Sequence, residues 1–435
     1  MIRIRPTEPI DFSGQVPGDK SISHRALILS ALASGVTVIE GLLHSADTTA
    51  TWQCLRALGA DIQQDPSGSV QVRGMAGRLS QPDQPLQAAN SGTTARLLLG
   101  VLAAAGVQAR LDGDDSLRQR PMRRVVEPLR AMGAEIDELG SSYRLPLQVR
   151  PASLHAANLQ IAVASAQVKS ALLLAALGAA GHSEVRLPQP SRDHTERMLA
   201  PFGVRVSQQL DPDGGEVVAL DGPRRLSTPG LLKVPGDPSS AAFLWAAAAV
   251  TGGRAEVSGV CLNARRIGFL HLLAEMGVQV QITVDQVDIE PVGRVVVTGR
   301  PTRAGLVSGP QVADMIDELP LAACVMAVAP GLSRVEGAAE LSVKESDRIA
   351  AMERGLSVLG VDCTATSDGW RIKGGRRIGH GQLDSDGDHR VGMALSVAAM
   401  AGSDVSTLLG DRVWEISYPT FLEQMQLAGG QLERV

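Results

Sequence analysis

The chain of 435 residues contains few aromatic side chains and no excess of basic ones. Aromatic residues make up 3% of the sequence, and 41 lysines and arginines face 46 aspartates and glutamates, for a formal net charge of −5. A general nucleic-acid binder would normally be basic and carry aromatic platforms for stacked bases, so this class of protein is disfavoured. The acidic balance also disfavours binding to an anionic membrane surface.

Cysteines and long hydrophobic runs are also scarce. The four cysteines (Cys54, Cys261, Cys324 and Cys363) are widely spaced and form no C-x-x-C pair, so neither a disulfide framework nor a metal site is predicted. The N-terminal segment has no apolar signal core, and the apolar stretches are shorter than the ~18 residues of a membrane span. These absences predict a cytoplasmic protein that does not bind membranes.

The most informative feature of the sequence is internal repetition. An Ala/Leu-rich helical pattern, a short strand pattern, a second helical pattern and a Leu-Gly-Ala-type ending recur six times, about every 70 to 80 residues. The clearest sign of duplication is Val16-Pro17-Gly18-Asp19, which recurs as Val234-Pro235-Gly236-Asp237. Six such units exceed a single core, so we predict an α/β (α+β) fold of two lobes, each built from three βαβαββ repeats. A cleft between two such lobes is a favoured place for a ligand.

The openings of the predicted first helices differ between copies, and the differences mark functional candidates. Copy four opens Gly236-Asp237-Pro238-Ser239, which is ordinary helix-start chemistry. Copy one instead has Lys20 and Ser21, with Arg25 one turn later, and copy six has Arg390. A cation in the first turn opposes the helix dipole by roughly 0.3–1 kcal/mol, which an anionic ligand would offset. One such cation is more simply a solvated surface residue, but several in an acidic chain favour phosphate or carboxylate binding.

Other motif residues extend this pattern to acid and base groups. Arg120 precedes the second helix of copy two, and Lys344 and Arg348 of copy five are four residues apart, which predicts one shared helix face. Asp317 and Glu345 are candidate acid/base groups, because nearby cations and burial shift carboxylate pKa values in opposite directions. Taken alone, each carboxylate is better explained as a salt-bridged surface acid.

Small polar residues open two further helices. Asn90-Ser91-Gly92-Thr93-Thr94 either brings backbone amides close to an anion or is a simple N-cap turn. Ser165-Ala166-Gln167 suits a hydrogen-bonded phosphate or hydroxyl. The histidines His24, His194 and His389 lack metal-ligand spacing and are interpreted as structural.

Eight of these motifs, in this order, closely resemble signatures of the 5-enolpyruvylshikimate-3-phosphate synthase family (3-phosphoshikimate 1-carboxyvinyltransferases). They are GDKSISHRA, NSGTTARLL, RPMRRVVEPL, ASAQVKSALLLA, SRDHTERML, IDELP, VKESDRI and DHRVGMAL. The resemblance implies a two-lobed, inside-out α/β barrel-like fold with two crossovers and an active site in the interdomain cleft. Residues 19–232 would form the N-terminal lobe with repeats 1–3. Residues 1–18 and 233–435 would form the C-terminal lobe with repeats 4–6.

The resemblance also implies a reaction in the shikimate pathway. The enolpyruvyl group of phosphoenolpyruvate would be transferred to the 5-hydroxyl of shikimate 3-phosphate by addition and elimination, with release of phosphate. It further implies a monomer that needs no metal or organic cofactor and is inhibited by glyphosate. Two anionic substrates require a concentrated cationic site, which agrees with the cations at the helix openings.

The family's functional positions carry over residue by residue. Asp317 would accept the proton of the target hydroxyl, Glu345 would move protons at the methylene carbon, and Lys20 would neutralise charge where the substrates meet. The implied contacts to shikimate 3-phosphate are Lys20, Ser21, Arg25, Ser165, Gln167, Ser191, Arg192, Asp317 and Lys344. The implied contacts to phosphoenolpyruvate are Lys20, Gly92, Arg120, Gln167, Arg348 and Arg390.

One position predicts the response to an inhibitor, and another departs from the family pattern. Relatives with alanine at the position of Gly92 tend to resist glyphosate, so glycine here predicts sensitivity. Some relatives carry a lysine where this chain has Ile416, so no cation is carried over there.

Two other functions were weighed against this interpretation. The enolpyruvyl transferase of peptidoglycan synthesis shares the fold but usually has a reactive cysteine in the loop that corresponds to residues 114–121, which here contains none. A non-catalytic anion-binding solenoid would have no use for the carboxylates Asp317 and Glu345 beside cations. Both features favour the shikimate-type transferase.

Overall fold

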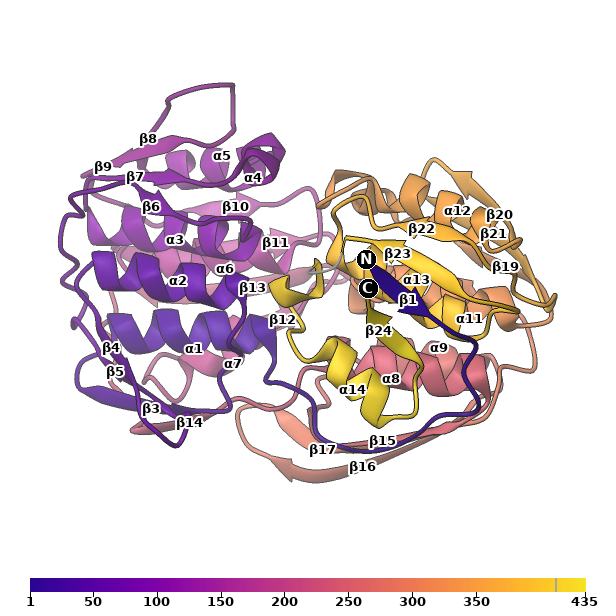
Figure 1. Cartoon of the computed structure of the whole chain (residues 1–435). Helices are drawn as coiled ribbons and strands as arrows, with labels where there is room; N and C mark the ends of the chain where they lie inside the picture. The colour runs from indigo at the N-terminus through magenta and orange to yellow at the C-terminus, as the bar shows by residue number, and fades with distance from the viewer. Residues whose placement is uncertain (411–412) are drawn as a thin grey trace. The chain divides into compact units, whose positions relative to one another are not determined.

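The structure is a computed structural model that describes residues 1–410 and 413–435. The chain divides into two compact units. The inserted unit comprises Lys20–Val234, and the terminal unit comprises Met1–Asp19 together with Pro235–Val435. In the described part of the chain each unit contains three four-stranded sheets (Figure 1), so the predicted six repeats and the α/β fold class are confirmed.

The three repeats of the inserted unit follow one order of elements. The first contains α1 (Lys20–Leu32), β3 (Val36–Glu40), α2 (Ala46–Ala57), β4 (Asp61–Gln64) and β5 (Val70–Arg73), and its sheet is completed by β14 (Leu231–Lys233). The second contains β6 (Leu86–Gln87), α3 (Gly92–Ala105), β7 (Ala109–Asp112), α4 (Asp115–Gln119), α5 (Arg123–Ala131), β8 (Glu135–Glu138) and β9 (Leu147–Arg150). The third contains β10 (Asn158–Gln160), α6 (Ala166–Ala176), β11 (Gly181–Leu187), α7 (His194–Leu199), β12 (Ser207–Leu210) and β13 (Glu216–Gly222).

The terminal unit repeats this order and uses both ends of the chain. Its first repeat contains β2 (Asp11–Gly14), α8 (Pro238–Thr251), β15 (Arg254–Cys261), α9 (Gly268–Glu275), β16 (Gln279–Val287) and β17 (Pro291–Thr298). The next contains β18 (Leu306–Val307), α10 (Gln311–Asp314), α11 (Leu319–Val328), β19 (Gly331–Val335), the 3₁₀ helix η1 (Ala339–Val343), α12 (Arg348–Val358), β20 (Asp362–Thr366) and β21 (Gly369–Gly374). The last contains β22 (Gln382–Asp384), α13 (His389–Met400), β23 (Ser406–Leu409), the 3₁₀ helix η2 (Val413–Ile416), α14 (Phe421–Leu427), β24 (Leu432–Arg434) and β1 (Ile2–Ile4).

All six sheets share one topology. A short edge strand runs parallel to the second strand, and the remaining pairs are antiparallel, as in β6-β7-β9-β8. In the last sheet β1 lies between β23 and β24, with Ile2 opposite both Leu408 and Arg434. The two chain ends therefore meet in one sheet of the terminal unit (Figure 1), where the Met1 amine contacts the Val435 carbonyl at 3.2 Å.

The first long helix of each repeat lies in the interior of its unit, with the sheets around it (Figure 1). All residues of α8 and of α13 are buried, as expected for helices that are apolar on every face. Within the inserted unit α3 packs so closely on α6 that a Cβ at Gly100 would overlap the carbonyl oxygen of Ala171. The small side chains at this contact therefore permit the close packing of α3 on α6.

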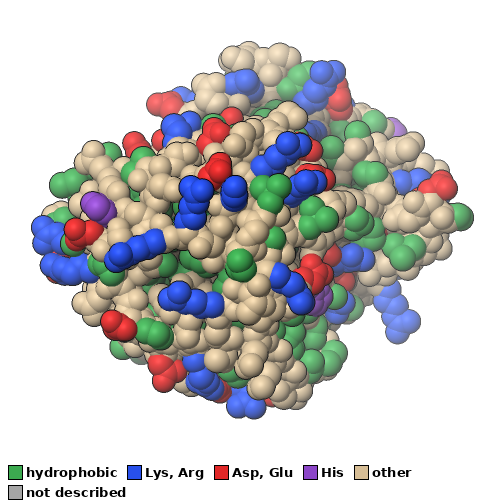
Figure 2. All heavy atoms as spheres, turned by 90° about the vertical axis from the view of Figure 1, so that its right-hand side faces the viewer, with side chains coloured by type: hydrophobic (Ala, Val, Ile, Leu, Met, Phe, Trp, Pro, Cys, Tyr) green, Lys and Arg blue, Asp and Glu red, His purple; other side chains and the backbone are tan. Residues whose placement is uncertain are grey.

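The distribution of surface charge and the length of the helices can be compared with the prediction that the protein does not bind membranes. On the face drawn in Figure 2, acidic and basic side chains are interspersed, and hydrophobic side chains occur in small separate groups. Among the described residues, no helix is both long and apolar enough to cross a bilayer.

Candidate active site

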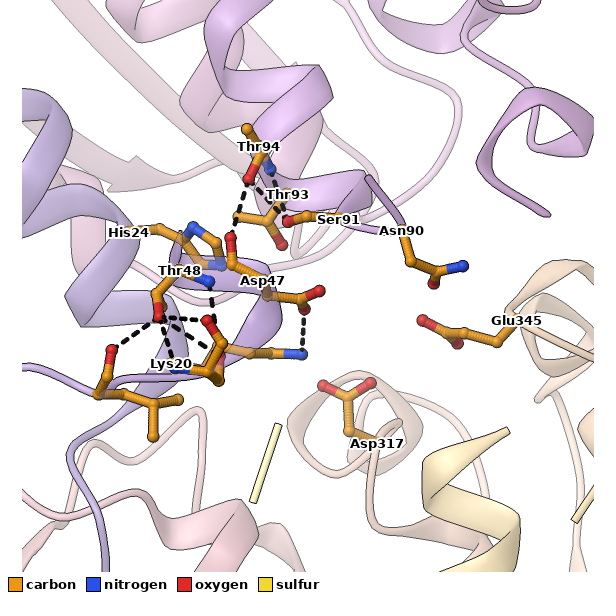
Figure 3. Close-up of polar contacts among 12 residues, drawn as sticks. Lys20, His24, Asp47, Thr48, Asn90, Ser91, Thr93, Thr94, Asp317 and Glu345 are labelled. Atoms are coloured by element: carbon orange, nitrogen blue, oxygen red, sulfur yellow. Dashed lines mark hydrogen bonds and ion pairs between the residues drawn. The ribbon is translucent and has the colours of Figure 1, made fainter. Parts of the chain in front are cut away.

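Lys20 is the first residue of α1, as predicted, and it has a carboxylate partner that the sequence did not indicate. Its Nζ lies 2.9 Å from Oδ2 of Asp47, in the first turn of α2 (Figure 3), and the two side chains are 17% and 10% exposed. An acid in a first helical turn is favourable by itself. The pair therefore holds the Lys20 ammonium at the N-terminal end of two helices.

Arg25 is buried and its guanidinium is fixed by oxygen atoms from three segments. Its Nε donates to Oγ1 of Thr195 at 2.7 Å, and its Nη2 donates to Oγ of Ser170 at 2.6 Å. Its Nη1 donates to the Ser21 carbonyl at 2.9 Å, and Thr195 also donates to Ser170 at 2.7 Å. These hydrogen bonds hold the Arg25 guanidinium in one orientation at the start of α1.

The start of α3 brings Gly92 beside two arginines. Ser91 is the N-cap and accepts a hydrogen bond from the Thr94 amide (Figure 3). A Cβ at Gly92 would lie 2.9 Å from Nη1 of Arg96 and 3.4 Å from Nη1 of Arg120. Arg120 was predicted as a site residue and Arg96 was not, although Arg96 lies one turn after Gly92 in the same motif.

Polar contacts link this arginine pair to α6. Arg120, which is buried, donates to Oδ1 of Asn90 at 2.6 Å. Arg96 donates to Oε1 of Gln167 at 2.6 Å, and Nε2 of Gln167 donates to Oγ1 of Thr93 at 2.9 Å. The starts of α3 and α6 therefore share one hydrogen-bond network.

Ser165 and Ser191 are the two remaining predicted serine contacts of the inserted unit besides Ser21. Ser165 is the N-cap of α6 and accepts from the Val168 amide at 3.4 Å. Ser191 is 5% exposed, and its hydroxyl has no hydrogen-bond partner among the described residues. Arg192 directly follows Ser191 and is half-buried.

Arg348 is the centre of the predicted site residues in the terminal unit. It is 2% exposed, and its Nη2 donates to Oε2 of Glu345 at 2.6 Å, while its Nε donates to Oδ2 of Asp388 at 2.8 Å. Its Nη1 lies 3.8 Å from Oδ1 of Asp317. Burial by itself would lower the pKa of Arg348, but these three carboxylates raise it above its ordinary value.

Asp388 was not selected from the sequence as a site residue, although it opens α13. Its carboxylate accepts from the amides of Arg390 and Val391 and so caps the helix. Burial opposes its ionised form, yet Arg348 and His389 hold the pKa of Asp388 below its ordinary value. Arg390, in the first turn of α13, lies with its guanidinium 5.9 Å from the ring centre of Phe243.

The prediction that Lys344 and Arg348 share a helix face is wrong. Lys344 follows the 3₁₀ helix η1, whereas α12 begins only at Arg348, because Asp347 is its N-cap and accepts from the Ile349 and Ala350 amides. Burial lowers the pKa of Lys344, against the opposing effect of Asp317. Lys344 is thus placed near Asp317 by the loop and not by helical spacing.

The fold of this chain is that of known enolpyruvyl transferases. The structure is similar to the enolpyruvyl transferase NikO from Streptomyces tendae, with a TM-score of 0.80, 16% identity, and coverage of 100% of this chain and 98% of that chain. It is similar to EPSP synthase from Acinetobacter baumannii with a TM-score of 0.86 and 37% identity, over 99% of each chain. The class defined by this fold, with its cations at helix starts, is that of the enolpyruvyl transferases.

Sequence relatives narrow the class. Residues 4–425 match the family described as EPSP synthase (3-phosphoshikimate 1-carboxyvinyltransferase). The 3-phosphoshikimate 1-carboxyvinyltransferase of Synechococcus sp. (strain JA-3-3Ab) is 44% identical over 98% of this chain and 96% of its own length. That of Gloeobacter violaceus is 45% identical over 97% of each. The chain belongs to the EPSP synthase family, as the sequence motifs predicted.

Family membership confirms the predicted enzyme class and reaction. The chain is an enzyme of the shikimate pathway that transfers the enolpyruvyl group of phosphoenolpyruvate to shikimate 3-phosphate. The peptidoglycan-type transferase and the non-catalytic solenoid are correspondingly disfavoured. The roles of individual residues stay predictions.

Proposed function

We propose that the residues collected at the helix starts of the two units bind the two substrates and catalyse the transfer. The observation that carries this proposal is the grouping of two acid/base candidates, Asp317 and Glu345, around the buried guanidinium of Arg348. Both carboxylates lie beside cations, Arg348 and Lys344, that can tune their protonation, as acid/base catalysis requires.

Shikimate 3-phosphate is proposed to bind mainly through the inserted unit. Arg25 and the unbonded Ser191 hydroxyl supply a charge and a donor to its phosphate, with Arg192 beside them. Lys20 and Asp317 are assigned to the hydroxyl side of the substrate. The other proposed contacts are Ser21, Ser165, Gln167 and Lys344.

Phosphoenolpyruvate is proposed to bind at Gly92, where the absent side chain leaves room beside Arg120. Its phosphate and carboxylate carry several negative charges, which require more than one arginine. The remaining proposed contacts are Lys20, Gln167, Arg348 and Arg390. Arg348 is engaged by protein carboxylates, so we expect it to stabilise charge on Glu345 and on the substrate together.

The proposed chemistry follows addition and elimination. Asp317 takes the proton of the 5-hydroxyl as its oxygen attacks C2 of phosphoenolpyruvate, and Glu345 gives a proton to the methylene carbon. The tetrahedral intermediate then loses phosphate, which leaves with the proton that Asp317 had taken, and Glu345 takes the methyl proton back as the double bond forms again. Atoms and charge balance without an oxidant, a reductant or a carrier group, so the proposal includes no metal or cofactor.

We further propose that the active site forms in the cleft between an N-terminal lobe (residues 19–232) and a C-terminal lobe (residues 1–18 and 233–435). The proposed contacts are divided between both lobes, so substrate binding should draw them together and exclude water. Small-angle X-ray scattering should show a smaller radius of gyration with shikimate 3-phosphate. An unchanged radius, in an enzyme that binds the ligand, would contradict closure. Glyphosate inhibition, a monomeric state and a cytoplasmic location belong to the same proposal.

Phosphate release tests the function directly. Purified enzyme is supplied with phosphoenolpyruvate and either shikimate 3-phosphate or UDP-N-acetylglucosamine, and inorganic phosphate is measured over time. Release only with shikimate 3-phosphate is expected. Release only with the UDP sugar, or none with either acceptor, would overturn the proposal.

A further inference from the structure

A buried ionic cluster in the inserted unit lies outside the residues discussed so far. Lys169 of α6 has a fully buried side chain, and its Nζ lies 2.6 Å from Oε1 of Glu196 in α7 and 2.8 Å from Oε2 of Glu216 in β13. Replacing buried ion pairs by apolar residues is often neutral or stabilising. Stability alone therefore does not account for one cation and two carboxylates at this place.

Two members of the cluster form hydrogen bonds with the backbone of Ser191. The Ser191 amide donates a hydrogen bond to Oε2 of Glu216 at an N···O distance of 3.2 Å. Nζ of Lys169 donates a hydrogen bond to the Ser191 carbonyl oxygen at 3.4 Å. Glu196 contacts Lys169, but no hydrogen bond joins it to Ser191 in the described part of the chain. The main chain of Ser191 is thus fixed on both sides, while its hydroxyl is left without a partner there.

The cluster also lies at the start of α6, beside other proposed contacts. Lys169 is two residues after Gln167, and its amide bonds to the Ser165 carbonyl at 3.0 Å. The next residue, Ser170, accepts a hydrogen bond from Arg25. The same turn of α6 therefore supports both Arg25 and Ser191.

We propose that Lys169 and Glu216 are positioning residues that aim the Ser191 hydroxyl at the phosphate of the acceptor substrate. They set the affinity for that phosphate without touching it. A donor held rigidly before binding loses less entropy when the ligand arrives, so its hydrogen bond contributes more to affinity. This inference rests on the proposed function, because it takes shikimate 3-phosphate as the ligand at Ser191.

Glu216→Ala and Glu196→Ala form a matched pair of variants. Each removes one buried carboxylate of equal size and leaves Lys169 with one carboxylate partner. Calorimetry measures the Kd of each variant for shikimate 3-phosphate and for shikimate, which lacks the phosphate. Glu216→Ala should weaken shikimate 3-phosphate binding about tenfold, the loss expected for one charge-assisted hydrogen bond, with shikimate binding unchanged. Glu196→Ala should change neither Kd by more than about twofold.

A conservative variant separates positioning from structural support. In Glu216→Gln the amide oxygen can still accept the Ser191 amide hydrogen, so most of the affinity should return. If Glu216→Ala does not fold, Glu216→Asp is compared with Glu196→Asp, because both keep the charge and shorten the side chain. Only the Glu216 variant should then lose affinity for the phosphate.

The outcomes distinguish this inference from the proposed function. Equal losses for shikimate and shikimate 3-phosphate, equal losses in both variants, or no loss at Glu216 would overturn the positioning role. Failure of the wild-type enzyme to bind shikimate 3-phosphate would instead overturn the proposed function itself.

Discussion

Replacing Gly92 by alanine is expected to weaken glyphosate inhibition strongly and phosphoenolpyruvate binding less. The added Cβ would lie 2.9 Å from Nη1 of Arg96, so this guanidinium group must shift, whereas its distance of 3.4 Å from Nη1 of Arg120 is an ordinary van der Waals contact. Crowding a packed site by one methyl group costs about 1–3 kcal/mol, which corresponds to a rise of roughly 5- to 150-fold in a dissociation constant. The dissociation constant of glyphosate, the longer molecule, should rise by an amount near the upper end of this range, and that of phosphoenolpyruvate should rise only a few-fold.

The same substitution should leave the fold intact. Gly92 is the first residue of α3 and has no left-handed backbone conformation, so alanine fits there without strain. Replacing glycine at a compatible position stabilises by about 0.4–1 kcal/mol, which offsets part of the cost of moving Arg96. The melting temperature should therefore change by no more than a few degrees.

Gly100→Ala is the matched control in the same helix. Its Cβ would overlap the carbonyl oxygen of Ala171, which is backbone and cannot turn aside as a side chain can. This variant should lower the melting temperature clearly, without separating inhibitor from substrate.

Both variants are measured for the Ki of glyphosate, the KM of phosphoenolpyruvate and the melting temperature. For Gly92→Ala, a proportional rise of Ki and KM together with a clear loss of thermal stability would refute the contact argument. Gly92 would then serve only the local turn.

Three further perturbations concern charged side chains in buried or partly buried ion pairs. Glu345→Gln should lower turnover by about 10²–10⁴-fold while calorimetry still shows shikimate 3-phosphate binding, and turnover near the wild-type value would remove Glu345 from the mechanism. Arg266 is buried, and its guanidinium lies 2.6 Å from Asp19 and 2.9 Å from Asp237. Arg266→Met should therefore reduce the free energy of unfolding, measured by urea titration, by about 3–5 kcal/mol. A loss below about 1 kcal/mol would show that the two aspartates do not need this cation. Burial raises the pKa of Glu196 above its ordinary 4.5 despite the opposing effect of Lys169, so wild-type stability should fall as pH rises above 4.5 through the folded-state pKa. Glu196→Gln should flatten this fall in urea titrations between about pH 4 and 8, and parallel curves for the two proteins would contradict the raised pKa.

Local sequence patterns were sufficient for the repeats and for the helix starts. Ser91, Ser165 and Asp388 each cap a helix through a hydrogen bond to an amide only two or three residues away. Such contacts depend on neighbouring backbone angles, which the residue types at a helix start already favour. The six-fold hydrophobic pattern likewise predicts the order of helices and strands, because burial on one face or on all faces is recorded in the spacing of apolar residues.

The long-range polar contacts depended on tertiary packing. The two ion pairs Arg348–Asp388 and Lys169–Glu216 join residues 40 and 47 positions apart, and the hydrogen bond from Arg96 to Gln167 joins residues 71 positions apart. The one spacing argument applied to charges, for Lys344 and Arg348, was wrong because Asp347 starts a new helix between them.

The sequence by itself determined the repeats, the helix starts and the family motifs, because each of these is recorded in neighbouring residues. Only the tertiary structure decided which charge meets which. No residue encodes a partner in another repeat, and pairs such as Arg348 and Asp388 come together because whole helices and strands pack to bury their apolar faces.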